Sequence, residues 1–300
     1  MAKHSAVVVD LGAERSMIDA VLSRVDHAHM AGLPTTVADA MRYGVRGPGK
    51  RMRGILVGYA YRAAGGTCDV SQLAAAVEIL HAYSLLHDDL PCMDDDDMRR
   101  GRPTVHKVYG VRTAVIAGMT MIPMAVRYAV SGANAVGATD HVRSMIVRTL
   151  MHAAGAAGMI GGQWLDLSAE GESLTLTELE KIHRAKTGAL IMASARIGAY
   201  AANADDDVVD ALSQYGADLG LAFQIVDDVL DVTATTDQLG KSAGRDEALH
   251  KSTYPALLGV QGAIERARSL IRDGCATLES AGLLTPELRH LADLVITRTN

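Results

Sequence analysis

Residues 88–97 hold six aspartates within ten positions, and two arginines, Arg99 and Arg100, follow them closely. So many like charges cannot pack together without a counter-charge, because removing each carboxylate from water costs several kcal/mol. Oxygen ligands next to arginines suit a hard cation such as Mg²⁺, which binds one or two carboxylates together with phosphate oxygens. A solvated acidic turn is the alternative interpretation of this stretch.

A second acidic motif contains Asp227 and Asp231, which lie four residues apart in an apolar surrounding. On a helix this spacing places both carboxylates on one face, together with Gln224 three residues before Asp227. An ordinary polar helix face would show the same pattern. Two carboxylate sets that face each other across a cavity could hold a polyphosphate through bridging Mg²⁺ ions.

The residues that precede the first acidic motif indicate what lies beneath it. His81 and Ser84 fall on the Asp88 face of the expected helix, with small and apolar residues further down. A cavity lined in this way suits a hydrocarbon tail that hangs from a diphosphate head. Taken alone, His81 is better explained as a buried histidine of the core.

Basic side chains flank both acidic motifs and could bind phosphate oxygens. Each of them alone could also be an ordinary surface cation. Apart from the Arg99-Arg100 pair, these residues lie in three places. Lys50 and Arg53 follow a glycine loop at 44–49, and Lys186 interrupts a helix before Thr187 and Gly188. Lys241 and Lys251 lie after the second acidic motif.

The composition predicts an all-α fold that positions these groups. Hydrophobic residues make up 49% of the chain and aromatic residues only 4%, so the core is built from Ala, Leu, Val, Ile and Met. No strand alternation and no linker is evident, and we expect one domain, residues 1–300, folded as a bundle of about ten or more helices around a central cavity. The expected helices are 11–30, 36–43, 52–64, 72–89, 111–130 with a kink at Pro123, 141–165, 177–203, 205–232, 254–280 with a weak point near Gly262, and 286–299. Residues 233–251 are expected to form a polar loop.

Charge and cysteine content exclude several classes of protein. A net charge of −6 without a basic block argues against a nucleic-acid partner. Cys68, Cys92 and Cys275 are widely spaced, which predicts reduced thiols in a cytoplasmic protein. The N-terminus does not read as a signal peptide. The longest uncharged apolar stretch, residues 113–126, is shorter than the ~20 residues that a spanning helix needs, so no membrane insertion is expected.

Together the motifs resemble those of the trans-isoprenyl diphosphate synthases, the polyprenyl synthetase family. The resemblance runs from about residue 41 to residue 258, and it is strongest to the bacterial short-chain members that make farnesyl and geranylgeranyl diphosphate. The matching motifs are GKRMR at 49–53, the stretch 81–101, GGQ at 161–163, KTG at 186–188, QIVDDVLD at 224–231 and KSTYP at 251–255.

The resemblance implies an isoprenoid-synthase fold, three Mg²⁺ ions in each active site, and a homodimer. At the first motif, Asp88 and Asp94 would bind metal with Asp89 in support, while the other three aspartates of the turn would be solvated or structural. At the second motif, Asp227 would bind the remaining ion, supported by Asp228 and Asp231.

The resemblance also divides the basic residues between two substrates. The allylic diphosphate would be held by Arg99, Lys186, Thr187, Gln224 and Lys241, with Lys251 as a further candidate. Isopentenyl diphosphate would be held by Lys50, Arg53, His81 and Arg100. Catalysis would rest mainly on Asp88, Asp94, Asp227, Lys186 and Arg99, which position the substrates and stabilise charge on the departing diphosphate.

The product is expected to be farnesyl diphosphate, because Tyr83 and Ser84 stand five and four residues before Asp88 and an aromatic at the first position resembles the farnesyl pattern. Geranylgeranyl and geranyl diphosphate are the alternatives, and Tyr83 could also be purely structural. Residues 117–121 depart from the pattern of the family, because an acidic residue is missing there and methionines are present instead. Met119 is therefore a third residue that could influence the chain length of the product. A non-catalytic partner subunit and a terpene cyclase are the other functions to be tested.

Overall fold

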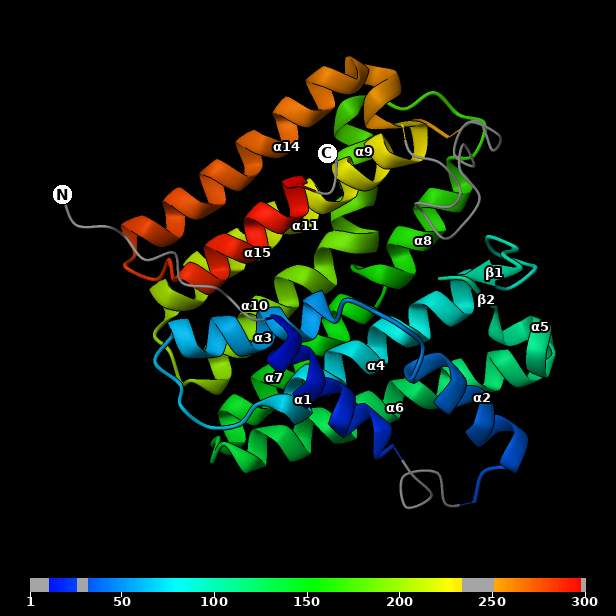
Figure 1. The fold of residues 1–300 in the computed structure, drawn as a ribbon, viewed down its shortest axis with the longest axis horizontal. Coiled ribbons are helices and arrows are strands. Elements are labelled where there is room, and N and C mark those ends of the chain that lie inside the picture. Colours follow the sequence, from blue (N-terminus) through cyan, green and yellow to red (C-terminus); the bar gives the residue numbers. More distant parts are fainter. Residues whose placement is uncertain (1–10, 26–31, 234–250, 298–300) are drawn as a thin grey trace.

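The computed structural model describes residues 11–25, 32–233 and 251–297, and these residues form helices almost throughout (Figure 1). The all-α prediction is therefore confirmed. The helices are α1 (Leu11–Ser23), α2 (Thr35–Val45), α3 (Met52–Ala63), α4 (Ser71–Asp88), α5 (Val105–Tyr109), α6 (Val111–Ala135), α7 (Asp140–Ala154), α8 (Met159–Ser168), α9 (Leu176–His183), the π-helical turn η1 (Arg184–Gly188), α10 (Ala189–Ala201), α11 (Asp206–Thr233), α14 (Tyr254–Ser280) and α15 (Pro286–Thr297).

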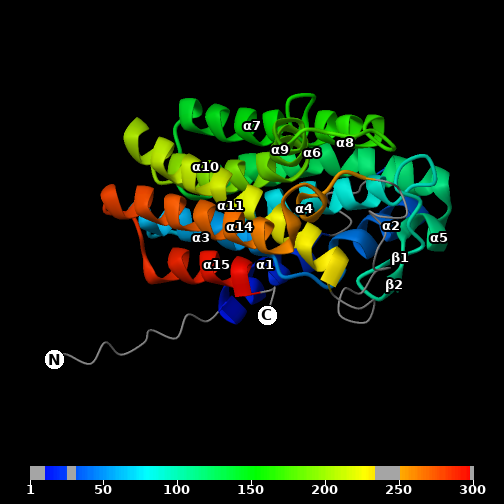
Figure 2. The same ribbon diagram turned by 90° about the horizontal axis from the view of Figure 1, so that it is seen from above.

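The helices lie in layers, with α7 and α8 along one side of the molecule and α1 and α15 along the opposite side (Figure 2). Helices α4, α10 and α11 lie between them, and small or aliphatic residues cover nearly all of their buried positions. A helix that is apolar on every side must lie inside a bundle. The inner helices α4 and α11 are also those that carry the two acidic motifs.

Two short strands were not expected from the sequence. Strand β1 (Met98–Arg99) pairs antiparallel with β2 (Arg102–Pro103) at the end of the molecule where α5 lies (Figure 1). Arg100 and Gly101, which join the strands, both have positive φ angles, of 53° and 74°. This is the conformation of a two-residue hairpin turn whose twist matches the strands. Two residues per strand are too few for an alternating pattern to be visible in a sequence.

The expected long helix over 141–165 is wrong, because the chain breaks between α7 and α8. Gly158 adopts a non-helical conformation, with φ −125° and ψ −132°. A Cβ atom at this position would lie 2.0 Å from the carbonyl oxygen of Ala153, so only glycine fits the turn. Gly158 therefore marks the break between α7 and α8.

Smaller differences concern other helix ends. The first helix ends at Ser23 and not near residue 30, and α6 continues through Pro123 to Ala135. The irregular position in α14 is Gly259, with φ 71°, three residues before the expected Gly262. Most of the expected polar loop 233–251, including Lys241, lies outside the described residues.

Helix α6 is the one described helix that is long and apolar enough to cross a membrane by length and composition alone. Its most apolar window is 44% buried against the rest of the chain. The helix packs against α2, α4, α5 and α7. A core helix of a bundle passes the same test of length and hydropathy, so this finding does not by itself indicate a membrane span.

Candidate active site

The first acidic motif begins where α4 ends. The backbone N–H of Asp94 donates to the carbonyl oxygen of Asp88 at 2.8 Å, and the N–H of Asp96 donates to that of Asp89 at 3.2 Å. These bonds close the intervening residues 90–93 into a compact turn. The turn brings Asp94 back over the end of the helix, beside Asp88.

Asp88 is the most strongly perturbed carboxylate of this turn. Burial raises its pKa to about 7; Lys186 and Arg99 lower it in part, while the charge of Asp94 raises it further. The protein itself thus does not supply enough positive charge to neutralise the two carboxylates. The side-chain oxygen of Gln163, whose Nε2 donates to Asp94 Oδ1 at 3.2 Å, is buried without a hydrogen-bond partner among the described residues. A hard cation fits this set of oxygens.

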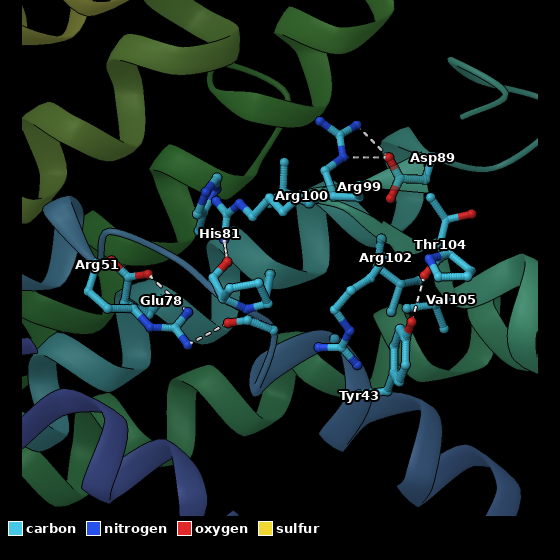
Figure 3. A pocket seen from close by; sticks show the side chains of 17 residues that line it. Tyr43, Arg51, Glu78, His81, Asp89, Arg99, Arg100, Arg102, Thr104 and Val105 are labelled. Carbon is cyan, nitrogen blue, oxygen red and sulfur yellow. Dashed lines mark hydrogen bonds and ion pairs between the residues drawn. The ribbon is translucent and has the colours of Figure 1, made fainter. Parts of the chain in front are cut away.

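Asp89 is engaged by a side chain of the protein itself. It is 3% exposed, and its Oδ1 accepts hydrogen bonds from both Nε, at 2.9 Å, and Nη2 of Arg99 (Figure 3). Asp96 accepts a further bond from Arg99 Nη2 at 3.1 Å. Two carboxylates therefore orient the Arg99 guanidinium, and Asp89 acts here as its partner.

The second acidic motif is held by a chain of hydrogen bonds across three helical segments. Thr187 Oγ1 donates to Gln224 Oε1 at 2.8 Å, and Gln224 Nε2 donates to Asp228 Oδ1 at 3.1 Å. Asp228 Oδ2 accepts the backbone N–H of Tyr254 at 3.1 Å. Both oxygens of Asp228 are thus engaged by the protein, and its side chain is 3% exposed.

Asp227 and Asp231 are the other two carboxylates of this motif. Asp231 is 4% exposed, whereas Asp227 is only half-buried. The negative charge of Asp227 acts on Arg53 of α3 and raises its pKa, although burial lowers it more. Of the three acids, Asp227 is therefore the one placed to reach a ligand between α3 and α11.

Lys186 and Thr187 lie in the π-helical turn η1 between α9 and α10. Single π-helical turns are rare and occur frequently at functional sites. Lys186 Nζ donates to Asp166 Oδ2 of α8 at 2.6 Å. A Cβ at Gly162 would lie 2.2 Å from the backbone nitrogen of Lys186, so glycine at this position allows α8 to approach the turn closely.

The residues expected to bind isopentenyl diphosphate gather where α3 faces α4. Arg53 Nη1 lies 3.3 Å from His81 Nε2, and since guanidinium only donates, this nitrogen of His81 accepts. Burial, followed by the charges of Arg53 and Arg100, holds the pKa of His81 well below its usual value. His81 is therefore neutral, and the positive charge resides on the arginines.

Arg51, which the sequence did not single out, holds the glycine loop in place. It is 7% exposed, pairs with Asp19 at 2.8 Å, and donates to the carbonyl oxygens of Val45 and Gly47. Glu78 lies 3.8 Å away and accepts the N–H of Gly54, which opens α3 (Figure 3). These contacts fix the backbone on either side of Lys50, whose side chain is exposed.

A cavity of about 60 Å³ connects this loop to the hairpin. His81, Arg99 and Arg100 line it, and Arg100 Nη1 donates to the carbonyl oxygen of Pro48 at 2.6 Å across it. Arg102 forms another wall, with its guanidinium 4.0 Å from the ring centroid of Tyr43 (Figure 3). The structure thus brings the predicted Arg99, Arg100 and His81 to one cavity.

The chain-length candidates fall into different environments. Tyr83 is 6% exposed and packs edge-on against His87, with 5.0 Å between the ring centroids. His87 Nε2 lies 3.1 Å from the carbonyl oxygen of Val115, and a Cβ at Gly118 would lie 2.2 Å from that nitrogen. Tyr83 and His87 therefore fill the space between α4 and α6, which Gly118 leaves open.

Two other chain-length candidates are placed differently. Ser84 Oγ donates to the carbonyl oxygen of His81 at 2.9 Å, within α4. Met119 was expected to flank the interior, but its side chain is 60% exposed on the outer face of α6. The buried methionines of α6 are Met121 and Met124. At about 100° per residue, both lie on the side of the helix opposite to Met119.

One group of possible metal ligands in the described residues lies on the outer side of the acidic turn. Ligand atoms of Asp95, Asp97 and His106 lie within 4.8 Å of one another. Asp97 already pairs with Lys107 Nζ at 2.8 Å. Asp95 and Asp97 were expected to be solvated or structural, and the ion pair of Asp97 is in keeping with that expectation.

Gln163 and Asp166 are site residues to which the sequence assigned no role. Gln163 contacts Asp94, and Asp166 contacts both Lys186 and Lys251, the latter at 2.9 Å. The two side chains are three residues apart on α8 and so share a face. That spacing, in a helix that begins with the GGQ motif, was the available signal.

Comparison with known proteins agrees with this arrangement. The family model described as polyprenyl synthetase matches residues 34–279. The chain belongs to the polyprenyl synthetase family. The matched region contains both acidic motifs and all the basic residues described above.

Several relatives within the polyprenyl synthetase family are similar along most of their length. Farnesyl diphosphate synthase of Escherichia coli (strain K12) is 46% identical over 271 residues, which cover 88% of this chain and 90% of that protein. Geranylgeranyl diphosphate synthase of Cyanophora paradoxa is 38% identical, with 90% of each covered. A geranyltransferase structure from Helicobacter pylori, complexed with magnesium and isoprenyl diphosphate, superposes with a TM-score of 0.82 at 30% identity, covering 96% and 95% of the two chains.

The raised pKa of Asp88 predicts how stability depends on pH in this polyprenyl synthetase when metal is removed by a chelator. Between its ordinary value of 3.8 and about 7, the folded chain holds a proton that the unfolded chain has lost. The free energy of unfolding therefore falls as pH rises through this range. Asp88→Asn removes this pH dependence. At pH 8 the free energy of unfolding of the metal-free variant should therefore exceed that of the metal-free wild type by at least about 1 kcal/mol, which corresponds to about 2 °C in melting temperature. Near pH 4 the two should not differ.

Thermal melts at both pH values, with Asp97→Asn as an exposed control on the same turn, measure this difference. Adding Mg²⁺ and pyrophosphate at pH 8 should stabilise the wild type and the control more than Asp88→Asn. The opposite result would be a metal-free melting temperature of the wild type that rises, relative to that of Asp88→Asn, between pH 5 and pH 8. It would show that the protein itself supplies enough positive charge for the Asp88 carboxylate.

Proposed function

We propose that the chain is a Mg²⁺-dependent short-chain trans-prenyltransferase that condenses isopentenyl diphosphate with an allylic diphosphate to form farnesyl diphosphate. The observation that carries this proposal is the placement of two carboxylate sites beside two separate groups of cations. Lys186 accompanies Asp88 and Asp94, Arg53 and Arg100 gather at His81, and Arg99 acts on Asp88 while also lining the His81 cavity. Two cationic groups fit two diphosphates.

Mg²⁺ supplies charge that neutralises the leaving diphosphate, and Asp88, Asp94 and Asp227 are the residues that would hold it, as three ions. Lys186, Arg99 and Gln224 then bind and orient the allylic diphosphate. As the bond between its first carbon and oxygen breaks, the double bond of isopentenyl diphosphate attacks that carbon. A proton leaves the new cation, and the released diphosphate is placed to accept it.

Arg53, Arg100 and Lys50 would bind the diphosphate of isopentenyl diphosphate, and neutral His81 would add a hydrogen bond. Asp89 and Asp96 hold Arg99 on the other side of the hairpin. Catalysis in this scheme is positioning together with electrostatic stabilisation, and no side-chain nucleophile is required. A terpene cyclase, which has a single diphosphate to bind, would have no use for the Arg53 group.

A cytoplasmic location is part of the proposal. Its three cysteines, Cys68, Cys92 and Cys275, form no disulfide with one another. Free thiols are typical of a reducing compartment. The wide spacing of these cysteines along the sequence was the basis for expecting reduced thiols in a cytoplasmic protein.

The reaction is tested by incubating the purified protein with Mg²⁺, labelled isopentenyl diphosphate and dimethylallyl, geranyl or farnesyl diphosphate in turn, and sizing the products. We expect elongation of the first two starters to a product of fifteen carbons. Asp94→Asn should reduce turnover by two or more orders of magnitude, because it removes a carboxylate needed in the transition state. Absence of elongation with every starter would refute the proposal and favour a non-catalytic partner subunit.

Product length is predicted to depend on Tyr83, whose ring closes the space between α4 and α6 beneath Asp88. Tyr83→Ala should give products longer than fifteen carbons from the same starters. Tyr83→Phe keeps the ring and should leave the product unchanged, which separates the loss of bulk from the loss of the hydroxyl. If Tyr83→Ala remains folded and its product distribution equals that of the wild type, Tyr83 is a packing residue only.

We also propose a homodimer that forms over the exposed apolar side chains of α6 and α8, which include Ile116, Met119 and Trp164, the last 70% exposed. Sedimentation at micromolar concentration should give twice the chain mass. Met119→Glu should shift the equilibrium toward the monomer, because dimer formation would then bury an unpaired charge. Val260→Glu, an exposed apolar residue on α14, serves as the matched control. A wild-type protein that sediments as a monomer would refute the proposal.

A further inference from the structure

Two lysines that the family resemblance assigns to the allylic diphosphate share a single carboxylate oxygen. Asp166 Oδ2 accepts a hydrogen bond from Lys186 Nζ at 2.6 Å and another from Lys251 Nζ at 2.9 Å. Glu170, in the turn that follows α8, lies 3.5 Å from Lys251. The two ammonium groups are thereby held next to each other.

Asp166 joins three segments that are far apart in the sequence. It projects from α8, Lys186 belongs to η1, and Lys251 precedes α14. Ser252, beside Lys251, accepts the N–H of Leu174 and donates to the carbonyl oxygen of Glu172, so the chain is fixed there as well. The position of Lys251 therefore depends on contacts with the α8–α9 connection.

The carboxylate of Asp166 and its two lysines stabilise one another, although two ammonium groups against one carboxylate leave the group with a net charge of +1. Burial alone would raise the pKa of Asp166, but Lys186 and Lys251 outweigh it and lower the pKa to about 2. The same attraction keeps the pKa of Lys186 above its usual value, although burial opposes it. Removing one partner of a buried ion pair leaves an uncompensated charge, which is strongly destabilising.

The ammonium groups have donors to spare. Each carries three N–H groups and uses one of them on Asp166. Lys186 is also attracted by Asp88 and Asp94, so its remaining donors lie near the carboxylates of the first motif. An anion that enters beside those carboxylates would meet both lysines without breaking their bonds to Asp166.

We propose that Asp166 is a positioning residue, which holds Lys186 and Lys251 side by side as a preformed receptor for the diphosphate of the allylic substrate. This inference rests on the proposed function for the identity of the ligand. Without Asp166, two half-buried ammonium groups would repel each other and move apart before the substrate arrives. The binding of that one diphosphate would then have to restore their arrangement.

Asp166→Asn keeps the shape of the side chain and removes its charge. We expect the KM for the allylic diphosphate to rise about tenfold or more, since two charge-assisted hydrogen bonds to the lysines are weakened. The KM for isopentenyl diphosphate, whose expected ligands lie at α3 and α4, should stay within about twofold. Asp166→Glu retains the charge and should recover part of the loss.

Glu170→Gln is the matched control, because it removes one negative charge next to Lys251 but leaves the bonds of Asp166 intact. It should change the allylic KM far less than Asp166→Asn does. If Asp166 instead competes with the diphosphate for the lysines, Asp166→Asn would lower the allylic KM. That result, an unchanged allylic KM, or an equal rise in both KM values would overturn the inference.

Calorimetric titration with pyrophosphate and Mg²⁺ gives a second readout that does not depend on turnover. Asp166→Asn, with its folding verified by circular dichroism, should bind pyrophosphate about tenfold more weakly than the wild type and the Glu170→Gln control. If the wild type binds pyrophosphate but elongates no starter, the proposed function fails while the role of Asp166 is still decided by this comparison. Equal binding by Asp166→Asn and wild type would refute that role.

Discussion

The crowding of carboxylates inside a helical bundle is the constraint on which the rest of this structure depends. Helices α4 and α11 pack inside the bundle over much of their length, yet each carries aspartates near its C-terminal end. The protein divides these acids into two kinds. Asp89 and Asp228 are satisfied by the chain itself, through Arg99 and through Gln224 with the Tyr254 backbone. Asp88 is left with a raised pKa, and so the chain retains anionic charge that a cation must neutralise.

The positive charges are arranged by the same principle. Arg51, Arg99 and Lys186 each lie within 4 Å of a carboxylate that fixes the direction of the side chain, namely Asp19, Asp89 and Asp166. A cation held in this way loses little conformational entropy when an anion binds, because its geometry exists beforehand. Arg53 is the contrast, since neutral His81 is its nearest polar neighbour and burial lowers its pKa. The charges at the two expected diphosphate sites are therefore supported by different means.

Much of this arrangement could be predicted from local spacing. The face shared by Gln224, Asp227 and Asp231 follows from the helical period, and the scarcity of aromatics together with the apolar periodicity predicts an all-α fold. Contacts between distant segments could not be predicted in this way. Asp166 is one acid on a helix, and only the fold shows that Lys186 and Lys251 meet it. The break at Gly158 and the hairpin turn at Arg100 depend on backbone conformations that a residue type permits but does not require.

The π-helical turn at Arg184–Gly188 amounts to one additional residue in what would otherwise be a continuous helix from α9 to α10. Each residue of an α-helix turns the chain by about 100°. Deleting one residue here would restore regular hydrogen bonding, but it would also rotate α9 against α10 by that angle. Either Lys186 and Thr187 or the buried face of α9 would then point the wrong way. The length of this short segment is therefore constrained as strictly as the identities of Lys186 and Thr187, and homologous chains should keep its residue count.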